Sequence, residues 1–167
     1  MRSVVVMGVS GSGKTTVGER LAARLGLRFV DADALHPAAN VEKMRAGVPL
    51  TDDDRWPWLD AVGAVLAEGG VVVACSALRR AYRDRLRGVA PFDLVYLHGD
   101  PDLLAERIGH RSGHFMPATL LQSQLDTLEV PDEAEHAVRA DVAHPADELV
   151  EQVVRDLGGE HAAAEPA

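Results

Sequence analysis

Two aspartates follow a short apolar stretch near the start of the sequence. Residues 29–37 read FVDADALHP, so Asp31 and Asp33 stand where the apolar run ends, and His36 follows closely. A carboxylate in such a place can accept hydrogen bonds from main-chain N–H groups and cap a turn. It can also hold a metal ion or accept a proton from a substrate. Which duty applies depends on what the rest of the chain places beside the pair.

A glycine-rich octapeptide gives these carboxylates a possible partner. Residues 8–15, GVSGSGKT, match the phosphate-binding pattern G-x-x-x-x-G-K-T in full, between the apolar run SVVVM and a helical pattern. Lys14 is expected to reach the β- and γ-phosphates, and the Thr15 hydroxyl to bind Mg²⁺. A glycine-rich turn without a ligand is the alternative. We predict that ATP is bound by Gly8, Val9, Ser10, Gly11, Ser12, Gly13, Lys14, Thr15 and Thr16.

The carboxylate that usually accompanies such a loop is missing from the third apolar run. In related phosphate loops an aspartate at the end of a later strand holds Mg²⁺. Here residues 71–78 read VVVACSAL and contain no carboxylate. We therefore expect Asp31, at the end of the neighbouring strand, to hold the ion through water.

The composition limits the classes of function. The 167 residues include 17 basic and 26 acidic side chains, and the formal net charge of −9 argues against neutralising a nucleic-acid backbone. A single cysteine, Cys75, excludes an internal disulfide and fits a reducing cytoplasm. No apolar run has the length of a signal peptide's core or a membrane span. We expect a cytoplasmic protein that binds neither nucleic acid nor membrane.

Apolar runs and helical patterns alternate along the chain without a repeat or a linker. Strands are expected at residues 3–7, 28–30, 71–75, 92–97 and, weakly, at an edge, 137–142. Helices are expected after the phosphate loop and at residues 37–47, 51–70, 79–87, 100–110, within 111–129 and at 145–157. This predicts an α/β P-loop NTPase fold, an open, mostly parallel sheet of about five strands with helices on both faces. One domain would span residues 1–157, with a helical lid at about 107–128 and a disordered tail at 158–167.

Five blocks of sequence stand in a fixed order along the chain. They read GVSGSGKT (8–15), DADALHPAANVEKMRAGVPLTDDDRWPWL (31–59), CSALRRAYRDRLR (75–87), VYLHGD (95–100) and GHFMPATLLQSQLDTLEVP (113–131). Together they resemble the gluconate kinases (gluconokinases), a family of small P-loop kinases. The resemblance implies Mg²⁺-dependent transfer of the ATP γ-phosphoryl group to the 6-hydroxyl of D-gluconate. The product, 6-phospho-D-gluconate, would feed the pentose phosphate or Entner-Doudoroff route, and relatives suggest a homodimer. The short second strand and the extended C-terminal tail depart from the family's pattern.

Gluconate carries a carboxylate at one end of a chain of hydroxyls, so its site needs a cation and several hydrogen-bonding groups. Asp33 lies two residues past Asp31 and, by strand periodicity, would point to the same face, toward the phosphate loop. We expect it to act as the base or positioning group for the attacking hydroxyl, with a turn cap as the alternative. His36 is expected to be a neutral partner of a substrate hydroxyl, unless it is a surface histidine.

Basic residues that suit a sugar acid occur on two segments. Fifteen of the 17 basic residues are arginine, so Lys43, the one lysine outside the phosphate loop, is a candidate, with helix-surface solvation as the alternative. Arg55 is favoured because similar small kinases bind the acid with an arginine on the helix after the second strand; a surface salt bridge is the alternative. Arg83 and then Arg79 are candidates because their helix starts at the carboxyl end of a central strand, although a solvated basic helix would look the same.

The stretch ERIGHRSGHFM (106–116) is expected to form a mobile lid that excludes water from the phosphates. Arg107 and Arg111 lie four residues apart at the end of a helix. We assign Arg107 to charge stabilisation in the transition state and Arg111 to nucleotide binding. Gln124, on the following helix, is expected to reach a substrate hydroxyl, although its leucine neighbours mark that helix first as core-facing.

Two other functions fit part of the sequence. A shikimate-type or other small-acid kinase shares the phosphate loop and the paired aspartates. It does not account for LHPAANVEKMRAGVPL (35–50) or GHFMPATLLQSQ (113–124). A non-catalytic ATP-binding switch module would leave Asp33 without a purpose. ADP release measured against a panel of sugar acids would separate these functions.

Overall fold

A five-stranded parallel sheet forms the centre of the molecule. The computed structural model describes residues 2–109 and 119–164. The strands are β1 (Val4–Met7), β2 (Arg28–Asp31), β3 (Val71–Ala74), β4 (Asp93–His98) and β5 (Val138–Asp141). Their order across the sheet is β2-β3-β1-β4-β5, and every neighbouring pair is parallel. The predicted α/β fold with an open parallel sheet is confirmed, including the edge position of β5.

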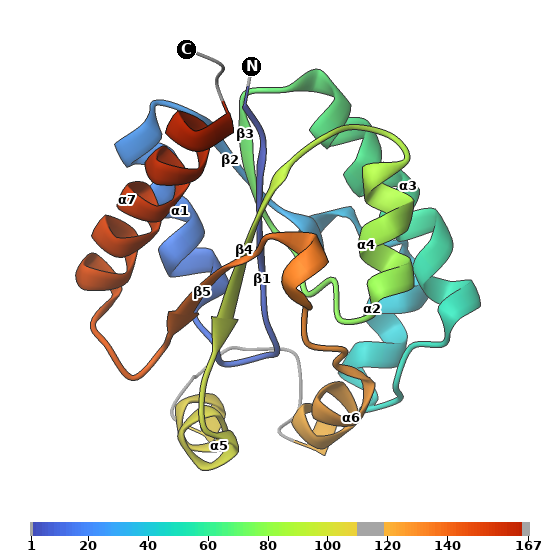
Figure 1. Ribbon diagram of the computed structural model, residues 1–167. Helices are drawn as coiled ribbons and strands as arrows, with labels where there is room; N and C mark the ends of the chain where they lie inside the picture. Colours follow the sequence, from blue (N-terminus) through green and yellow to red (C-terminus); the bar gives the residue numbers. More distant parts are fainter. Residues whose placement is uncertain (1, 110–118, 165–167) are drawn as a thin grey trace.

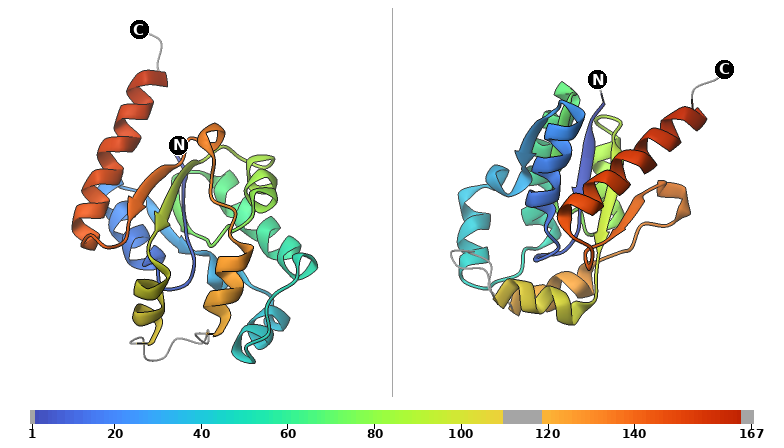
Figure 2. Two further views of the ribbon diagram at one scale, coloured as in Figure 1. Left: turned by 60° about the horizontal axis from the view of Figure 1, so that its bottom comes forward. Right: turned by 90° about the vertical axis from the view of Figure 1, so that its left-hand side faces the viewer.

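Helices cover both faces of this sheet (Figure 1). One face carries α1 (Lys14–Leu25) and α7 (Ala146–Ala164), and the other carries α3 (Asp52–Glu68) and α4 (Arg80–Arg87). The shorter helices are α2 (Ala38–Arg45), α5 (Pro101–Gly109), α6 (Thr119–Thr127) and the 3-10 helices η1 (Ala32–Leu35) and η2 (Glu133–Glu135). Figure 2 shows from two further sides that α5 and α6 lie beyond the carboxyl ends of the strands. Open parallel sheets bind ligands at this end.

The sheet separates two hydrophobic cores, and β1 contributes to both. Val4 and Val6 are buried in the core beneath α1 and α7, whereas Val5 and Met7 are buried in the core beneath α3 and α4. A strand covered on both faces has no solvent side, which explains its uninterrupted run of valines. The edge strand β5 instead alternates buried and exposed residues.

Most helix ends follow the expected signals. Before α3, the Thr51 side chain accepts a hydrogen bond from Asp54 N while the Asp54 carboxylate accepts one from Thr51 N. At the other end of the chain, α7 continues past the expected end at residue 157, so residues 158–164 of the expected tail are helical. Residues 110–118 of the expected lid and residues 165–167 of the tail lie outside the described residues. No helix of the described ranges combines the length and the apolar character that crossing a membrane requires.

Candidate active site

The phosphate loop joins β1 to α1 at the carboxyl end of the sheet. Gly13 precedes α1 with a φ of 88°, a left-handed conformation that favours glycine. A Cβ on Gly8 would lie 2.6 Å from Ser12 Oγ and 2.9 Å from a main-chain oxygen of β4, so no larger residue fits there. Lys14 Nζ donates a hydrogen bond to the Val9 main-chain oxygen at 3.1 Å. The ammonium group is therefore folded back over the loop.

Thr15 and Asp31 bring two oxygen donors together beside this loop. The Thr15 hydroxyl donates to Asp31 Oδ2 at 3.1 Å, while Asp31 Oδ1 accepts from Asp33 N at 2.9 Å and so caps η1. Mg²⁺ prefers such oxygens and commonly takes its other ligands from water and phosphate. The pair therefore fits the predicted metal role. Residues 2–109 and 119–164 contain no group of three or more His, Cys, Asp or Glu side chains that is arranged to hold a metal ion.

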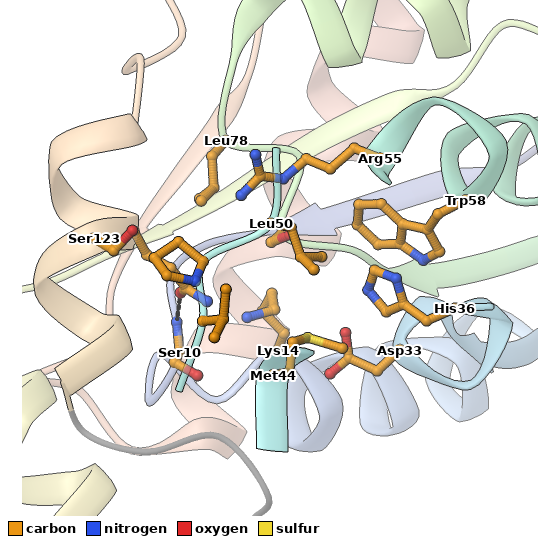
Figure 3. Close-up of a pocket in the computed structure, with 14 residues that line it drawn as sticks. Ser10, Lys14, Asp33, His36, Met44, Leu50, Arg55, Trp58, Leu78 and Ser123 are labelled. Atoms are coloured by element: carbon orange, nitrogen blue, oxygen red, sulfur yellow. Dashed lines mark hydrogen bonds between the residues drawn. The ribbon is translucent and has the colours of Figure 1, made fainter. Parts of the chain in front are cut away.

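A cavity opens beside Lys14 (Figure 3). The space between its walls, counted together with the solvent at its open mouth, is about 590 Å³. The lining residues are Ser10, Lys14, Asp33, His36, Met44, Val48, Pro49, Leu50, Arg55, Trp58, Ser76, Leu78, Ser123 and Gln124. In Figure 3, Lys14 and Asp33 lie together in the lower part of the view, and the Arg55 guanidinium group lies in the upper part, beside Leu78. The cavity thus has a carboxylate at one end and a guanidinium group at the other.

Asp33 lines the cavity, but not for the predicted reason. β2 ends at Asp31, and Asp33 belongs to the 3-10 helix η1. Strand alternation therefore does not reach Asp33, and the argument from strand periodicity is wrong. The turn after β2 brings Asp33 to the same cavity as Lys14. The capping role that was the alternative for Asp33 is performed by Asp31.

His36 presents a neutral ring to the cavity. The ring stacks on Trp58 with centroids 4.2 Å apart and planes inclined by 14°. The Trp58 indole N–H is itself fixed, because it donates to the Ala32 main-chain oxygen at 2.7 Å. Burial lowers the pKa of His36 to about 4, and the charge of Arg55 acts in the same direction against that of Asp31. An uncharged imidazole at neutral pH can exchange hydrogen bonds with a hydroxyl group.

Arg55 and Gln124 add a cation and an amide to the lining. Arg55 donates a hydrogen bond to the Tyr82 hydroxyl at 3.0 Å, and its guanidinium carbon lies 5.3 Å from the centroid of the Tyr82 ring. The Tyr82 hydroxyl in turn donates to Asp52. Gln124 Oε1 accepts a hydrogen bond from Ser10 N at 2.7 Å. Helix α6 therefore contacts the phosphate loop directly.

A second hollow lies beside the phosphate loop, at the start of α1. It is lined by Gly11, Ser12, Gly13, Thr16, Val17, Leu103, Glu106, Arg107, His144, Pro145, Ala146 and Leu149. Arg107 donates to the Val142 main-chain oxygen at 2.6 Å. Ser12 Oγ is buried and, within the described ranges, is the only such side-chain polar atom without a hydrogen-bond partner. Arg107 thus lies with the phosphate loop rather than in the cavity that contains Asp33.

Two predicted substrate-binding residues lie outside the cavity lining, at the surface. Lys43 Nζ forms an ion pair with the Asp54 carboxylate at 2.7 Å. Arg79 lies 3.6 Å from the Asp52 carboxylate, in a shallow hollow that shares Arg55 with the cavity lining. Both therefore interact with the first turn of α3. The predicted nucleotide-binding residue Arg111 lies outside the described residues.

Arg83 is also outside the cavity, in the protein interior. Its side chain is 1% exposed and that of Glu135 is 2% exposed. Arg83 Nε and Nη2 donate to the two Glu135 carboxylate oxygens at 2.7 and 2.9 Å. The remaining hydrogen bonds of Arg83 run to the main-chain oxygens of Ala77, Leu78 and Glu129. Burial opposes ionisation of Glu135, but hydrogen bonds from Arg83 and Arg87 outweigh it and lower its pKa to about 2.

Several lining residues carry no chemical signal in a single sequence. Trp58 belongs to the apolar stripe of α3, yet it forms the stacking surface for His36. Leu103 and Pro145 are far apart in the chain and meet only because α5 and the start of α7 both adjoin the phosphate loop. The pattern HPADE at residues 144–148 marks a helix start and was the available signal for that hollow.

A family model, curated relatives and a solved structure match this chain. The family model described as Shikimate kinase matches residues 10–157. Gluconokinase from Gluconobacter oxydans is 50% identical over 165 residues, which cover 95% of this chain and 93% of the relative. Thermosensitive gluconokinase from Escherichia coli is 44% identical over 158 residues, which cover 90% of this chain and 84% of the relative. The crystal structure of a gluconokinase from Sinorhizobium meliloti 1021 matches with a TM-score of 0.90 at 51% identity and covers 98% of each chain.

Proposed function

The chain belongs to the gluconokinase family, and on this premise we propose how its residues transfer the γ-phosphoryl group of ATP to the 6-hydroxyl of D-gluconate. The observation that carries the proposal is the cavity shared by Lys14, Asp33 and Arg55. A phosphate-binding lysine and a carboxylate lie toward one end, and a guanidinium group toward the other (Figure 3). This polarity matches a chain with a hydroxyl to be phosphorylated at one end and a carboxylate at the other.

ATP is assigned to the phosphate loop and the second hollow. Main-chain N–H groups of the loop and Lys14 Nζ would bind the β- and γ-phosphates, and Leu103, Arg107 and Pro145 would lie against the nucleotide. The Thr15 hydroxyl and, through water, Asp31 would hold Mg²⁺, which when bound neutralises charge on the phosphates. Arg107 is within the same hollow, which supports a contact with the nucleotide, and the expected role of Arg111 stays a prediction.

Asp33 is the proposed base for the attacking hydroxyl. O6 of gluconate forms a bond to the γ-phosphorus, and the bond between that phosphorus and the β,γ-bridging oxygen breaks to release ADP. The proton of the 6-hydroxyl passes to the Asp33 carboxylate. Lys14 compensates negative charge on the transferred group. The position of Asp33 and Lys14 in one cavity supports this assignment.

The other cavity side chains are proposed to select the acceptor. Arg55 would bind the gluconate carboxylate through charge-assisted hydrogen bonds, because its side chain is only 14% exposed and faces the cavity. His36 would contact a hydroxyl of the chain. Gln124 would lie close to both ATP and gluconate, since its Oε1 contacts the phosphate loop and its side chain lines the cavity.

A coupled assay of ADP release tests the activity. Gluconate should stimulate ADP release far more than shikimate or other sugar acids do, and turnover on another acid without stimulation by gluconate would exclude the proposal. Asp33→Asn should lower kcat by about 100-fold or more, as expected for the loss of a general base, and leave the KM for ATP within about twofold. Asp60→Asn, on the exposed side of α3 where Asp60 pairs with Arg85, is the matched control and should keep full activity.

We further propose a cytoplasmic homodimer that binds neither nucleic acid nor membrane. The net charge of −9 supports the absence of a nucleic-acid partner, and the buried free thiol of Cys75 fits a reducing compartment. The homodimer rests on the resemblance to other gluconate kinases. Sedimentation should give twice the chain mass of 17.9 kDa, and a single-chain mass would contradict the dimer.

A further inference from the structure

Asn40 makes two hydrogen bonds beside the cavity, one of them to His36. Asn40 Nδ2 lies 3.1 Å from His36 Nδ1 and 2.9 Å from the Asp54 main-chain oxygen. The side chain is buried, with the residue 3% exposed, and it is the only asparagine in the sequence. Its amide therefore has a fixed place between α2 and the first turn of α3.

The contact with Asp54 decides which way the Asn40 amide faces. A main-chain carbonyl oxygen can only accept a hydrogen bond, so the NH₂ side of the amide must face it. The opposite orientation would bring two acceptor oxygens together. The second hydrogen of the same NH₂ group then points to His36 Nδ1, which must accept. A neutral imidazole that accepts at Nδ1 carries its proton at Nε2.

We propose that Asn40 is a positioning residue that holds His36 in the Nε2–H tautomer, so that the ring offers a hydrogen-bond donor to an oxygen of the acceptor substrate. Stacking on Trp58 fixes the plane of the same ring. The side-chain hydrogen bond that His36 makes within the described ranges uses Nδ1, with Asn40 as the partner. The His36 side chain also lines the cavity. The identity of the ligand as a sugar acid rests on the proposed function, whereas the tautomer does not.

The surroundings of the ring favour its neutral form. Burial is the main effect that opposes a positive charge on His36. Arg55 on α3 acts in the same direction, while Asp31 at the end of β2 favours the charge, and Asp33 and Lys14 line the same cavity. The first turn of α3 that orients Asn40 is itself braced, because the Asp54 carboxylate pairs with Lys43 and accepts a hydrogen bond from Thr51 N. Lys43 thereby contacts the same residue, Asp54, whose main-chain oxygen orients Asn40.

Nuclear magnetic resonance of the full chain with ¹⁵N-labelled histidine tests the tautomer without any ligand. The His36 signals, assigned by their loss in His36→Gln, should show a protonated Nε2 and an unprotonated Nδ1 at pH 7. A wild-type ring protonated at Nδ1 would overturn the proposal. In Asn40→Asp, whose carboxylate can only accept, the Nδ1 signal should become that of a protonated nitrogen. An unchanged signal in the folded variant would also overturn it.

Kinetics test whether the tautomer matters to the substrate. Asn40→Asp should raise the KM for gluconate about tenfold, the cost of one misplaced hydrogen bond, and leave the KM for ATP unchanged. Because Gln keeps a donor near the position of Nε2, the same Asn40→Asp change made in His36→Gln should add less than about twofold. An equal tenfold increase in both backgrounds would show that Asn40 does not act through His36. If the tautomer is as expected but gluconate is not phosphorylated, the proposed function fails and the tautomer assignment stands.

Discussion

Arg55 and Arg83 lie on helices that pack on the same face of the sheet, yet their guanidinium groups have different surroundings. Arg55 lines the cavity, donates to one hydroxyl, and has a side chain 14% exposed. Arg83 is fully enclosed and donates to both oxygens of Glu135 and to three main-chain oxygens. Arg55 therefore retains N–H donors for a ligand. The N–H donors of Arg83 instead bind other parts of the fold.

The comparison shows how partners rather than residue type decide the role of an arginine. A buried ion pair costs desolvation that only complete hydrogen bonding can offset, so Arg83 is bound to its neighbours on every side. Through those bonds it ties the segment after β3, which includes Ser76 and Leu78 of the cavity, to the segment after α6. Arg83 therefore fixes the position of a segment that lines the cavity without lining the cavity itself.

The largest effect is expected from Arg83→Met. The change would remove the two Arg83 hydrogen bonds from the buried Glu135 carboxylate, which would keep only the one from Arg87, and would remove the Arg83 hydrogen bonds to three main-chain oxygens, so the free energy of unfolding should fall by about 3 kcal/mol. Urea denaturation measures this loss. Arg85→Met, on the exposed side of the same helix, is the matched control and should show no measurable change. A stable Arg83→Met protein with a raised KM for gluconate would instead restore the substrate-binding role predicted for Arg83.

The second largest effect is expected from Arg55→Met, which tests whether Arg55 binds the substrate. Loss of a charge-assisted hydrogen bond to the substrate carboxylate should raise the KM for gluconate about 10- to 100-fold. Steady-state kinetics with gluconate and with ATP varied in turn would separate this from damage to the nucleotide site. The urea midpoint should stay close to that of the wild type, the reverse of the result for Arg83→Met. A large stability loss with an unchanged KM would reverse the roles given to the two arginines.

The smallest expected effect is the pH dependence of the free energy of unfolding, which differs for His36 in the cavity and Glu135 beside Arg83. His36 has a pKa lowered from 6.5 to about 4, so the unfolded chain binds a proton at this ring before the folded chain does. Stability is therefore full above pH 6.5 and falls as the pH drops toward 4, by an amount of the order of 1 kcal/mol because the cavity is open to solvent. Glu135, whose pKa is lowered from 4.5 to about 2, begins to lose its stabilising effect as the pH falls below about 4.5, at the acidic end of that window.

Urea denaturation at pH 7, 5.5 and 4.5 would measure the His36 effect. His36→Gln cannot titrate, so its stability should change less over this range than that of the wild type. Equal slopes for the two proteins would show that His36 is not buried in its neutral form.

Features set by neighbours in the chain could be predicted from the sequence, whereas those set by distant partners could not. β1 and α1 depend on consecutive residues, and their prediction is confirmed. Asp31 and Thr15 were both assigned to the metal ion from the sequence, and a hydrogen bond of 3.1 Å joins them. Arg83 could not be separated from Arg79 by helix spacing, since its partner Glu135 lies 52 residues away in the chain.

Most of the polar residues that line the cavity could be predicted from the sequence, but the shape of the cavity could not. Asp33, His36, Arg55 and Gln124 line it as expected, but Lys43 does not, because an ion pair with Asp54 holds it outside. Lysine rarity in the composition carries no information about such a partner. The role of Asn40 likewise depends on a main-chain oxygen of the next helix, which no residue pattern reports.

The position of β1 also determines which parts of the molecule can open locally and exchange their amide hydrogens. Because β1 pairs with β3 and β4 and sends alternate side chains into both cores, its amide hydrogens should exchange with solvent only when the whole domain unfolds. The phosphate loop extends directly from this strand, while Met44, Ser123 and Gln124 come from short helices at the edge of the domain. β1 should therefore be among the slowest parts of the molecule to exchange, and the short helices that carry residues of the acceptor side should open and close many times within one lifetime of the folded state.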